Sequence, residues 1–594
     1  MRTLWRTVAS SVHVPFIDTL EETLHSFSAS GRVLFVFFSG TLVFSTCALL
    51  LILNNSMQVV IPAHGGSLSE GIIGTPRFIN PVLAVSDADH DLSQLVYSGL
   101  LKATPDGGYA PDLAESYTVS GDGKTYTFVL RKNATFQDGT PISADDVVFT
   151  IAKTQDPIIK SPERANWSGV NVQKIDDRTI QFTLGQAYAP FIENLTLGIL
   201  PKRLWGNVSD SDFALSELNT DPVGSGPFRV SSISRTSSGV PSSYDLSAFS
   251  TYALGRPYLD TLSLHFYQNE SDLVDGLKSG EIESASGISP AALPSVASDT
   301  IDRSTLDRVF AVFFNQNQSE VLRDAGVRDA LNKSIDRNQL ITQVLHGYGT
   351  AVTGPVPPGV LGSPSAATSA ISAFATSTVA TNTDLALAAR NQLLASGWQI
   401  GQNGILQKTT GSGKSAKTVT LAFSLATGNV PELRDAAEYL RTTWEKVGAK
   451  VDVQVYDQGD LSQNVIRPRK YDALLFGEVI GREVDLFAFW DSSQRIDPGL
   501  NIALYANSTA DKILEQLRGT ADENQRTGLY QQFTGELAKD TPAVFLYAPD
   551  FVYIVPKDVH GLTLGLIETP SDRFLGAAQW YRETDHVWPI FAKK

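Results

Sequence analysis

The chain of 594 residues contains a single cysteine, Cys47, and its 63 acidic residues outnumber its 47 basic ones. One cysteine excludes any disulfide within the chain. The formal net charge of −16 argues against a general nucleic-acid binder, because such proteins gain affinity by neutralising phosphates. The same charge suits a soluble exterior domain. We therefore expect no nucleic-acid partner.

Patterns that would carry catalysis or hold a cofactor are also scarce. The eight histidines, at 13, 25, 64, 90, 265, 346, 560 and 586, have no acidic or histidine partners at metal-ligand spacing. A Gly-x-Ser-x-Gly elbow is absent, and Cys47 lies inside an apolar run, which excludes a cysteine nucleophile. Residues 411–415 end like a phosphate-binding loop, but Lys408 stands where its first glycine belongs. We expect no enzyme, no metal and no cofactor.

One long apolar run stands near the N-terminus. Residues 33–53 contain 21 residues without a charge, enough to cross a hydrocarbon core of roughly 30 Å. The run exceeds the apolar part of a cleaved signal peptide, and a cysteine in mid-span fits lipoprotein processing poorly. Three arginines precede the run and the next basic residue is Arg77, so the positive-inside rule places the N-terminus in the cytoplasm. The sequence predicts a cytoplasmic tail over 1–32, a single-pass anchor over 33–53 and a large extracytoplasmic domain.

The remaining chain is long enough for several lobes and alternates strand and helix patterns. Short strands are predicted over 125–130, 179–184, 262–266 and 451–456. Apolar residues recur at three- and four-residue spacing over 430–447, which predicts an amphipathic helix that ends at Gly448. Such alternation indicates an α/β protein.

The most informative segment covers residues 95–149. After the strand over 125–130, the residues FQDGTPISADDVVF at 136–149 place a tight turn at Asp138-Gly139. Ser143 then reads as the N-cap of a helix with acidic residues in its first turn. This is scaffold and carries no catalytic chemistry.

The segment resembles the signature region of the extracytoplasmic solute-binding proteins of family 5, which serve peptide and nickel ABC importers. Further patches resemble the family in the same order, over about residues 80–556. They are Asn80-Pro81 with LVYSGL at 95–100, DPVGSGPF at 221–228, LKSGEIE at 277–283, VRDALNKSIDR at 327–337 with GPVPP at 354–358, and residues 384–398, which end in Gly-Trp.

This resemblance implies an α/β two-lobe periplasmic-binding-protein fold (type II, Venus flytrap) behind an N-terminal transmembrane helix. The lobes would be joined by two chain crossings, near residues 308–314 and 544–553. A linker is expected over 54–71, lobe I over 72–308 with 554–594, and lobe II over 309–553. The implied function is capture of oligopeptides or similar small solutes by hinge closure and delivery to ABC permease subunits. We expect a monomer.

The resemblance also points to a ligand cleft. In peptide-binding relatives, a Gly-Trp…Asp-Tyr-x-Asp-Pro segment supplies an aspartate that pairs with the ligand's α-amino group. The matching segment is 476–490, in which Asp485 matches the second aspartate. The amine-binding position falls on or near Arg482, so that Glu478 or Glu483 would have to take the pairing role. Two interpretations stay open: a cleft with altered ligand chemistry, or a surface charge at a shifted alignment.

Other residues are expected at the cleft from the same resemblance. Relatives offer backbone hydrogen bonds to an extended ligand just before Asn80-Pro81, a form of strand addition. Asn315 matches an asparagine at the lobe crossing, where a hinge role is an equal alternative. Trp490 could stack on a ligand, although core packing is the commoner use of such a residue. The predicted ligand-binding residues are Thr75, Arg77, Phe78, Asn315, Glu478, Arg482, Glu483, Asp485 and Trp490.

Two functions of other classes remain as alternatives. A sensory or scaffold protein could reuse the same fold and signal through the anchor, and co-purification with permease subunits separates it from a transport protein. A surface hydrolase acting on peptides would lose activity when Glu478 or Asp485 is replaced. Neither alternative has a sequence feature of its own.

Overall fold

The computed structural model describes residues 23, 26–296, 301–358, 360, 384–410, 416–520 and 522–592. Residues 1–63 with 583–594 form one compact unit, and residues 64–582 form a second. The loop resembling a phosphate-binding motif, 411–415, and most of the predicted cytoplasmic tail lie outside the described residues.

The first unit contains the predicted anchor. The apolar run lies within helix α3 (Ala29–Met57), which begins after Ser28, whose hydroxyl accepts a hydrogen bond from the Gly31 N–H. Within α3, residues Ala29–Asn54 are long and apolar enough to cross a membrane. Strand β1 (Val59–Pro62) follows and pairs antiparallel with β23 (Thr584–Val587). Length and composition thus fit a membrane anchor or a signal sequence.

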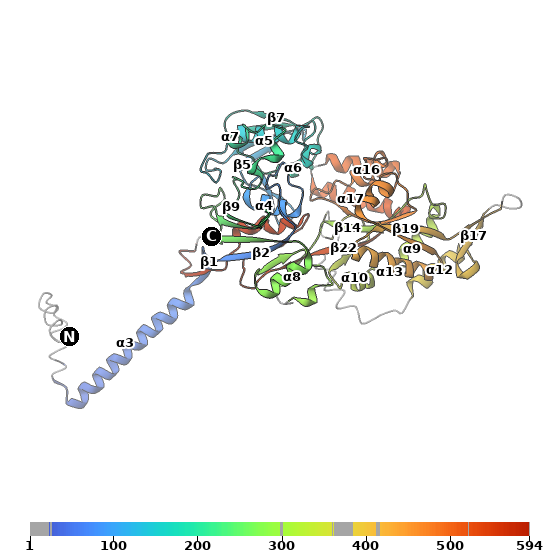
Figure 1. The fold of residues 1–594 in the computed structure, drawn as a ribbon. Coiled ribbons are helices and arrows are strands. Elements are labelled where there is room, and N and C mark those ends of the chain that lie inside the picture. The colour runs from blue at the N-terminus through green and yellow to red at the C-terminus, as the bar shows by residue number, and fades with distance from the viewer. Residues whose placement is uncertain are drawn as a thin grey trace. The chain divides into compact units, whose positions relative to one another are not determined.

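A mixed sheet of twelve strands runs through the second unit (Figure 1). Its order is β20-β19-β21-β14-β22-β12-β2-β11-β10-β9, and β13 and β15 also pair with β22. The strands are β2 (Ser67–Ile73), β9 (Phe228–Arg235), β10 (Pro241–Ala248), β11 (Thr261–Tyr267), β12 (Ser284–Ser286), β13 (Ile301–Thr305), β14 (Arg308–Phe314), β15 (Gly349–Ala351), β19 (Ala422–Gly428), β20 (Lys450–Tyr456), β21 (Ala473–Val479) and β22 (Ala543–Ile554).

Strand β22 is shared by two halves of this sheet. Its first residues pair with β14, and its last residues, from Asp550, pair with β13 and β12. Strands β13 and β14 run alongside and are separated by Leu306 and Asp307 alone. We call residues 64–306 and 550–582 the first half of the unit, and residues 308–549 the second half. The chain therefore passes between the halves at β13–β14 and at β22, close to the crossings expected from the sequence.

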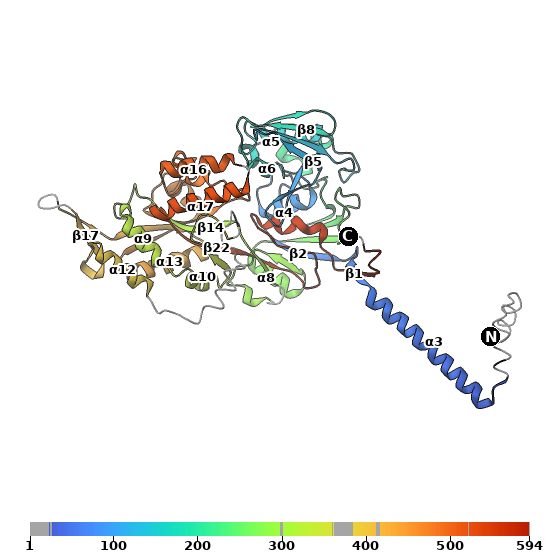
Figure 2. The ribbon, with the colours of Figure 1, turned by 180° about the vertical axis from the view of Figure 1, so that it is seen from behind.

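Helices cover both faces of the sheet in the second half, as Figures 1 and 2 show from opposite sides. One face carries α9 (Ala325–Lys333), α10 (Arg337–Val344), α12 (Leu385–Ala395) and α13 (Pro431–Val447) over one buried core. The other face carries α15 (Phe487–Trp490), α16 (Ser508–Gly519) and α17 (Glu523–Asp540) over another. The predicted amphipathic helix is α13, with Trp444 fully buried, and it ends at Gly448 with φ of 107°. Both predictions are confirmed.

The first half carries a separate four-stranded sheet with its own core. Its strands are β5 (Ala114–Val119), β6 (Thr125–Leu130), β7 (Asn171–Lys174) and β8 (Thr179–Thr183), and α5 (Ala144–Gln155) packs against them. The strand predicted over 125–130 is β6, and Ser143 begins α5 through a capping box with Asp146. A two-stranded sheet of β3 (Leu101–Ala103) and β4 (Tyr109–Pro111) and the one-turn helices α6 (Phe191–Asn194) and α7 (Lys202–Trp205) complete this region.

Two of the family-like patches meet because glycine lets two backbones approach. Helix α4 (Asp87–Val96) ends against the segment 224–228. A Cβ on Gly224 would lie 2.0 Å from the carbonyl oxygen of Val96, and one on Gly226 would lie 2.6 Å from that of Leu95. Both approaches are shorter than any carbon–oxygen contact, so side chains are excluded there.

A buried ionic network ties the first half together. Arg573, in the 3₁₀ helix η11 (Pro570–Gln579), is 1% exposed; its Nε lies 2.9 Å from Glu70 Oε1 and its Nη2 lies 2.8 Å from Asp91 Oδ2. The hydroxyl of Tyr553 donates to Glu70 Oε2 at 2.7 Å. Burial raises the pKa of Asp91 to about 6 despite the adjacent guanidinium. The network joins β2, α4, β22 and η11 and fixes the start of η11.

The predicted linker over 54–71 differs from the structure. It contains β1 and the first residues of β2, and Leu68 and Glu70 of β2 are wholly buried. The sequence Ser-Leu-Ser-Glu-Gly reads as polar because Glu70 is charged. Its charge is compensated by Arg573, which stands 503 positions away in the chain.

Candidate ligand-binding site

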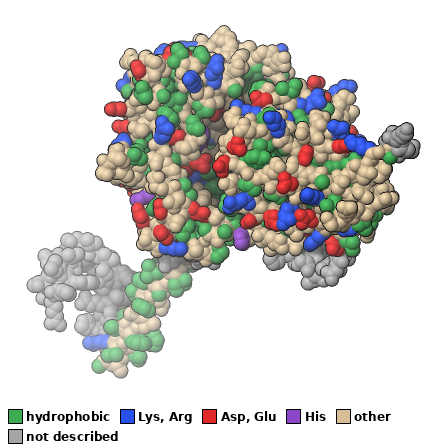
Figure 3. Space-filling model, turned by 45° about the vertical axis from the view of Figure 1, so that its right-hand side comes forward, with side chains coloured by type: hydrophobic (Ala, Val, Ile, Leu, Met, Phe, Trp, Pro, Cys, Tyr) green, Lys and Arg blue, Asp and Glu red, His purple; other side chains and the backbone are tan. Residues whose placement is uncertain are grey.

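A cavity of about 450 Å³ opens in the first half and meets the second half at Arg482. Its size falls in the range of roughly 300–1,000 Å³ that is usual for small-molecule sites. In Figure 3 the molecular surface is hollowed where acidic side chains gather. The polar residues that line the cavity include Tyr97, Tyr109, Glu193, Arg482, Glu568 and Asp572.

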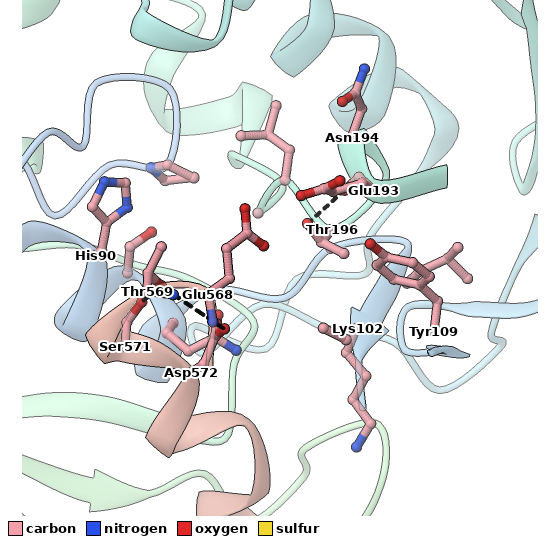
Figure 4. Close-up of a pocket in the computed structure, with 18 of the residues that line it drawn as sticks. His90, Lys102, Tyr109, Glu193, Asn194, Thr196, Glu568, Thr569, Ser571 and Asp572 are labelled. Carbon is pink, nitrogen blue, oxygen red and sulfur yellow. Dashed lines mark hydrogen bonds between the residues drawn. The ribbon is translucent and has the colours of Figure 1, made fainter. Parts of the chain in front are cut away.

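The two glutamates come from segments far apart in the chain. Glu193 lies in α6, which begins after Pro190. Glu568 stands just before η11, where Thr569 and Asp572 form a capping box and Asp572 Oδ2 accepts the N–H of Glu568 at 2.8 Å. Figure 4 shows both carboxyl groups pointing into the cavity from its opposite walls, while the Lys102 ammonium points away.

The carboxyl groups of Glu193 and Glu568 lie close enough to influence each other's pKa. Burial, followed by repulsion from Glu568, raises the pKa of Glu193 to about 9. Burial also raises the pKa of Glu568. No ion pair of Glu193 is found in the described part of the chain. At neutral pH Glu193 is therefore expected to be protonated.

A third carboxyl group lies behind this pair at the crossing between the halves. Asp307 is 1% exposed, and neither of its carboxylate oxygens has a hydrogen-bond partner among the described residues. Burial, and then the charge of Glu568, raise the pKa of Asp307 to about 7. Its backbone is fixed on both sides, because its N–H donates to Ile567 and its carbonyl accepts the N–H of Ile480.

Arg482 joins the second half to the cavity wall. It follows β21 in a tight turn in which Gly481 and Val484 both have positive φ, of 79° and 51°, and the second value is strained for a β-branched residue. Its side chain is 2% exposed. The guanidinium donates to Asp572 Oδ2 at 2.7 Å and to the carbonyl oxygens of Leu566 at 2.8 Å and Thr104 at 3.2 Å. All three acceptors belong to the first half.

A second bridge between the halves lies beside the first. Asp485 Oδ2 accepts the hydroxyl of Tyr188 at 3.3 Å and pairs with Arg518 at 2.9 Å. The Arg518 guanidinium also lies 5.0 Å from the ring centre of Tyr188 and 4.6 Å from that of Phe487, within cation–π range. Tyr188 belongs to the first half and the other residues to the second, so the structure holds the halves together at two places.

The segment predicted to offer strand addition has its donors occupied. Thr75 and Phe78 are half-buried and Arg77 is exposed. The backbone N–H groups of Arg77 and Phe78 donate to Asp89 Oδ1 at 2.7 and 2.8 Å. An extended ligand could use these donors only if Asp89 released them.

The other predicted residues do not line the cavity. Glu478 is 5% exposed on β21, and burial raises its pKa well above the usual range. Glu483 pairs with Arg526 at 3.1 Å. Asn315 is buried and shapes the turn after β14 through the N–H groups of Asn317 and Gln318. Trp490 is fully buried among Phe313, Tyr505, Phe533 and Phe545.

Arg482 is thus the one predicted residue that lines this cavity, and Asp485 lies in the adjacent bridge. Sequence reasoning missed Glu193, Asp307 and Glu568. The capping box of Thr569 and Asp572 marks a helix start and gives no sign of Glu568. Glu193 lies in a helix of only four residues, too short to show a periodic pattern, and no sequence signal marks it.

The model for bacterial extracellular solute-binding proteins, family 5, matches residues 108–493 of this chain. The chain belongs to this family. The oligopeptide-binding protein AppA of Bacillus subtilis is 28% identical over 514 residues, which cover 84% of this chain and 89% of AppA.

Solved structures of the family share the fold described above. The structure of B. subtilis AppA in complex with a nonapeptide matches with a TM-score of 0.64 and 26% identity, over 88% of this chain and 99% of that one. The ABC transporter substrate-binding protein CtaP of Listeria monocytogenes matches with a TM-score of 0.70 and 26% identity, over 88% of this chain and 100% of its own. The predicted α/β solute-binding fold of family 5 is confirmed, and the chain is the extracytoplasmic solute-binding component of an ABC importer.

Proposed function

We propose that this family 5 protein captures peptides and that Glu193 and Glu568 bind a cationic ammonium group of the ligand. The observation that carries the proposal is the pair of carboxyl groups that point into a cavity of about 450 Å³ from its walls (Figure 4). The similarity to AppA, whose structure contains a nonapeptide, supports a peptide as the ligand.

The charges around the cavity favour a cation. The carboxyl groups of Glu193, Asp307, Glu568 and Asp572 lie close to one another, and among the described residues the guanidinium of Arg482 is the cation that interacts with them. An ammonium group donates three hydrogen bonds and can replace the proton that Glu193 holds. Hydrogen bonds between a cation and a carboxylate are about twice as strong as neutral ones.

Arg482 stands at or near the position where peptide-binding relatives are expected to have the amine-binding aspartate. Its guanidinium pairs with Asp572 of the first half and would repel a ligand amine placed beside it. The carboxyl groups across the cavity offer the opposite charge. The ammonium position would therefore have moved from the second half to the first, which corresponds to the altered cleft considered from the sequence.

Capture would proceed by closure of two lobes over the ligand. The closing bodies would be lobe I, predicted over 72–308 and 554–594, and lobe II, predicted over 309–553; β2 extends lobe I back to residue 67, and residues 583–594 belong to the first unit instead. The two crossings at β13–β14 and β22 support a hinge there. A ligand that contacts both lobes shifts the population toward the closed form by as much as it binds that form more tightly. Predicted residues near the turn of Arg482, including Glu483 and Asp485, would act in closure.

The protein would work at the extracytoplasmic face of the membrane. Helix α3 would be an uncleaved single-pass anchor with the N-terminus in the cytoplasm, and the closed form would dock as a monomer on ABC permease subunits. Binding alone is required of this chain, so no residue is assigned a catalytic role. The apolar composition and length of α3 support the anchor.

A thermal-shift series on the full chain in detergent micelles tests this function. Pools of di- to pentapeptides, oligosaccharides and nickel chelates would be compared, because a ligand of the native state stabilises it by RT ln(1 + [L]/Kd). We expect the peptide pool to raise the melting temperature and the same pool with acetylated N-termini and no lysine to raise it less. A shift from another pool alone would refute the peptide assignment.

A further inference from the structure

The last described residues form an apolar turn in the first unit. The N–H of Phe591 donates to the carbonyl of Trp588 at 2.8 Å and closes a turn over residues 588–591. Ile590 is 81% exposed and Phe591 is 70% exposed. Exposed turns are usually built from Gly, Asn, Asp, Ser and Pro, so two large apolar side chains at the tip need a separate explanation.

This turn lies beside the end of the membrane-span candidate. The indole N–H of Trp588 donates to Asn54 Oδ1 at 2.9 Å, and Asn54 is the last residue of the span candidate. Strand β23, which precedes the turn, pairs along its whole length with β1, which follows α3. The turn is therefore held at the level of the extracytoplasmic end of α3 by contacts within one compact unit.

The length of the span sets the depth of the turn. The 26 residues of the candidate span are about 39 Å long at 1.5 Å per residue, against a hydrocarbon core of roughly 30 Å. Asn54 then lies in the interfacial layer, where tryptophan is enriched because its ring is apolar and its N–H is polar. Trp588 meets that description, and the neighbouring Met57 and Val60 are exposed as well.

We infer that the turn over residues 588–591 inserts Ile590 and Phe591 into the headgroup layer of the membrane that α3 spans. Both chain segments of the first unit, the one with α3 and the one with the turn, would then contact the same bilayer. Lys593 and Lys594 follow in the sequence, and lysines at this depth favour anionic headgroups. The inference rests on the proposed anchor and is independent of the proposed ligand.

The single cysteine makes a direct test possible. In the full chain with Cys47→Ser, one new cysteine is introduced by Phe591→Cys, Ile590→Cys or Ser238→Cys and labelled with an environment-sensitive fluorophore. Ser238 is an exposed residue of the turn between β9 and β10 and is the water-exposed reference. The chain is placed in nanodiscs of phosphatidylethanolamine and phosphatidylglycerol, with or without lipids that carry a quencher near the headgroup.

We expect the label at 590 or 591 to emit at shorter wavelength and to lose at least half of its intensity to the lipid quencher, while the label at 238 stays unquenched. Labels at 590 and 591 that behave like the label at 238 would overturn the inference. Shielding that depends on protein concentration and not on quencher lipid would assign the turn to contact with a second copy, which also overturns it. The intact mass of the protein separates failure of this inference from failure of the proposed anchor, because loss of α3 by cleavage refutes the anchor itself.

Discussion

The contact of Arg482 with the first half is expected to hold the unliganded protein closed. Replacement by methionine keeps most of the side-chain length but removes the ion pair with Asp572 and two donors to buried carbonyl groups. Side chains of this pair are 2% and 13% exposed, so solvent screens their interaction little. Removing one partner of a buried ion pair costs about 3–5 kcal/mol. If that cost falls on the closed form, the ratio of closed to open molecules drops by a factor of roughly 10² to 10⁴.

Single-molecule energy transfer would measure this change. Donor and acceptor dyes would be attached through Ser211→Cys in the first half and Glu515→Cys in the second, both exposed, in a Cys47→Ser chain. The matched control is Arg441→Met, because Arg441 also pairs with two carboxylates but lies on one helix and is 34% exposed. Exposed pairs contribute at most about 1 kcal/mol.

The Arg482→Met chain should show a lower transfer efficiency without ligand, and the Arg441→Met chain should match the unmodified protein. An unchanged distribution in Arg482→Met would refute the argument that this guanidinium holds the halves together. Equal changes in both variants would show that the effect is one of general charge.

Three further predictions concern stability. Arg573→Leu should lower the free energy of unfolding by about 3–5 kcal/mol, because it leaves buried carboxylates without their cation, and urea denaturation would show a cost below 1 kcal/mol if the network were dispensable. Gly224→Ala should cost at least about 1–3 kcal/mol, since its Cβ would overlap the carbonyl of Val96, and a neutral effect on the melting temperature would contradict that geometry. Because the pKa of Glu193 is raised in the fold, its contribution to stability is complete below the usual pKa of a glutamate and is lost as pH rises toward 9, so Glu193→Gln should flatten the decline in unfolding free energy measured between pH 5 and 9.

Much of the scaffold could be predicted from the sequence because its signals are local. The spacing of apolar residues before Gly448 predicted α13, and Ser143 predicted the start of α5. The glycines at 224 and 226 were recognised as a family pattern, and the structure supplies the physical reason, which is the close approach of the end of α4. Strand β2 was missed because its buried Glu70 is neutralised by a residue remote in the sequence.

The candidate site was harder to predict because its residues meet only after folding. Glu193 and Glu568 are brought together by segments that lie 375 positions apart, and Asp307 joins them from the crossing between the halves. Family resemblance led to Arg482, which lies at the cavity, and to Trp490, which is fully buried in the core. A pattern along one strand or helix cannot show which charged residues share a wall.

Titration calorimetry of the full chain in detergent micelles tests the central claim most directly. A peptide from the pool that stabilises the protein would be titrated at pH 7.5 in buffers of different ionisation enthalpy, into the unmodified chain, Glu193→Gln and Glu163→Gln. Glu163 is the matched control, because it lines the same cavity and its carboxylate accepts a hydrogen bond from the side-chain amide of Asn166. The account predicts release of about one proton per ligand, lost with Glu193→Gln together with about tenfold or more in affinity, and a smaller effect of Glu163→Gln. Binding without proton release, or equal effects of the two variants, would contradict it.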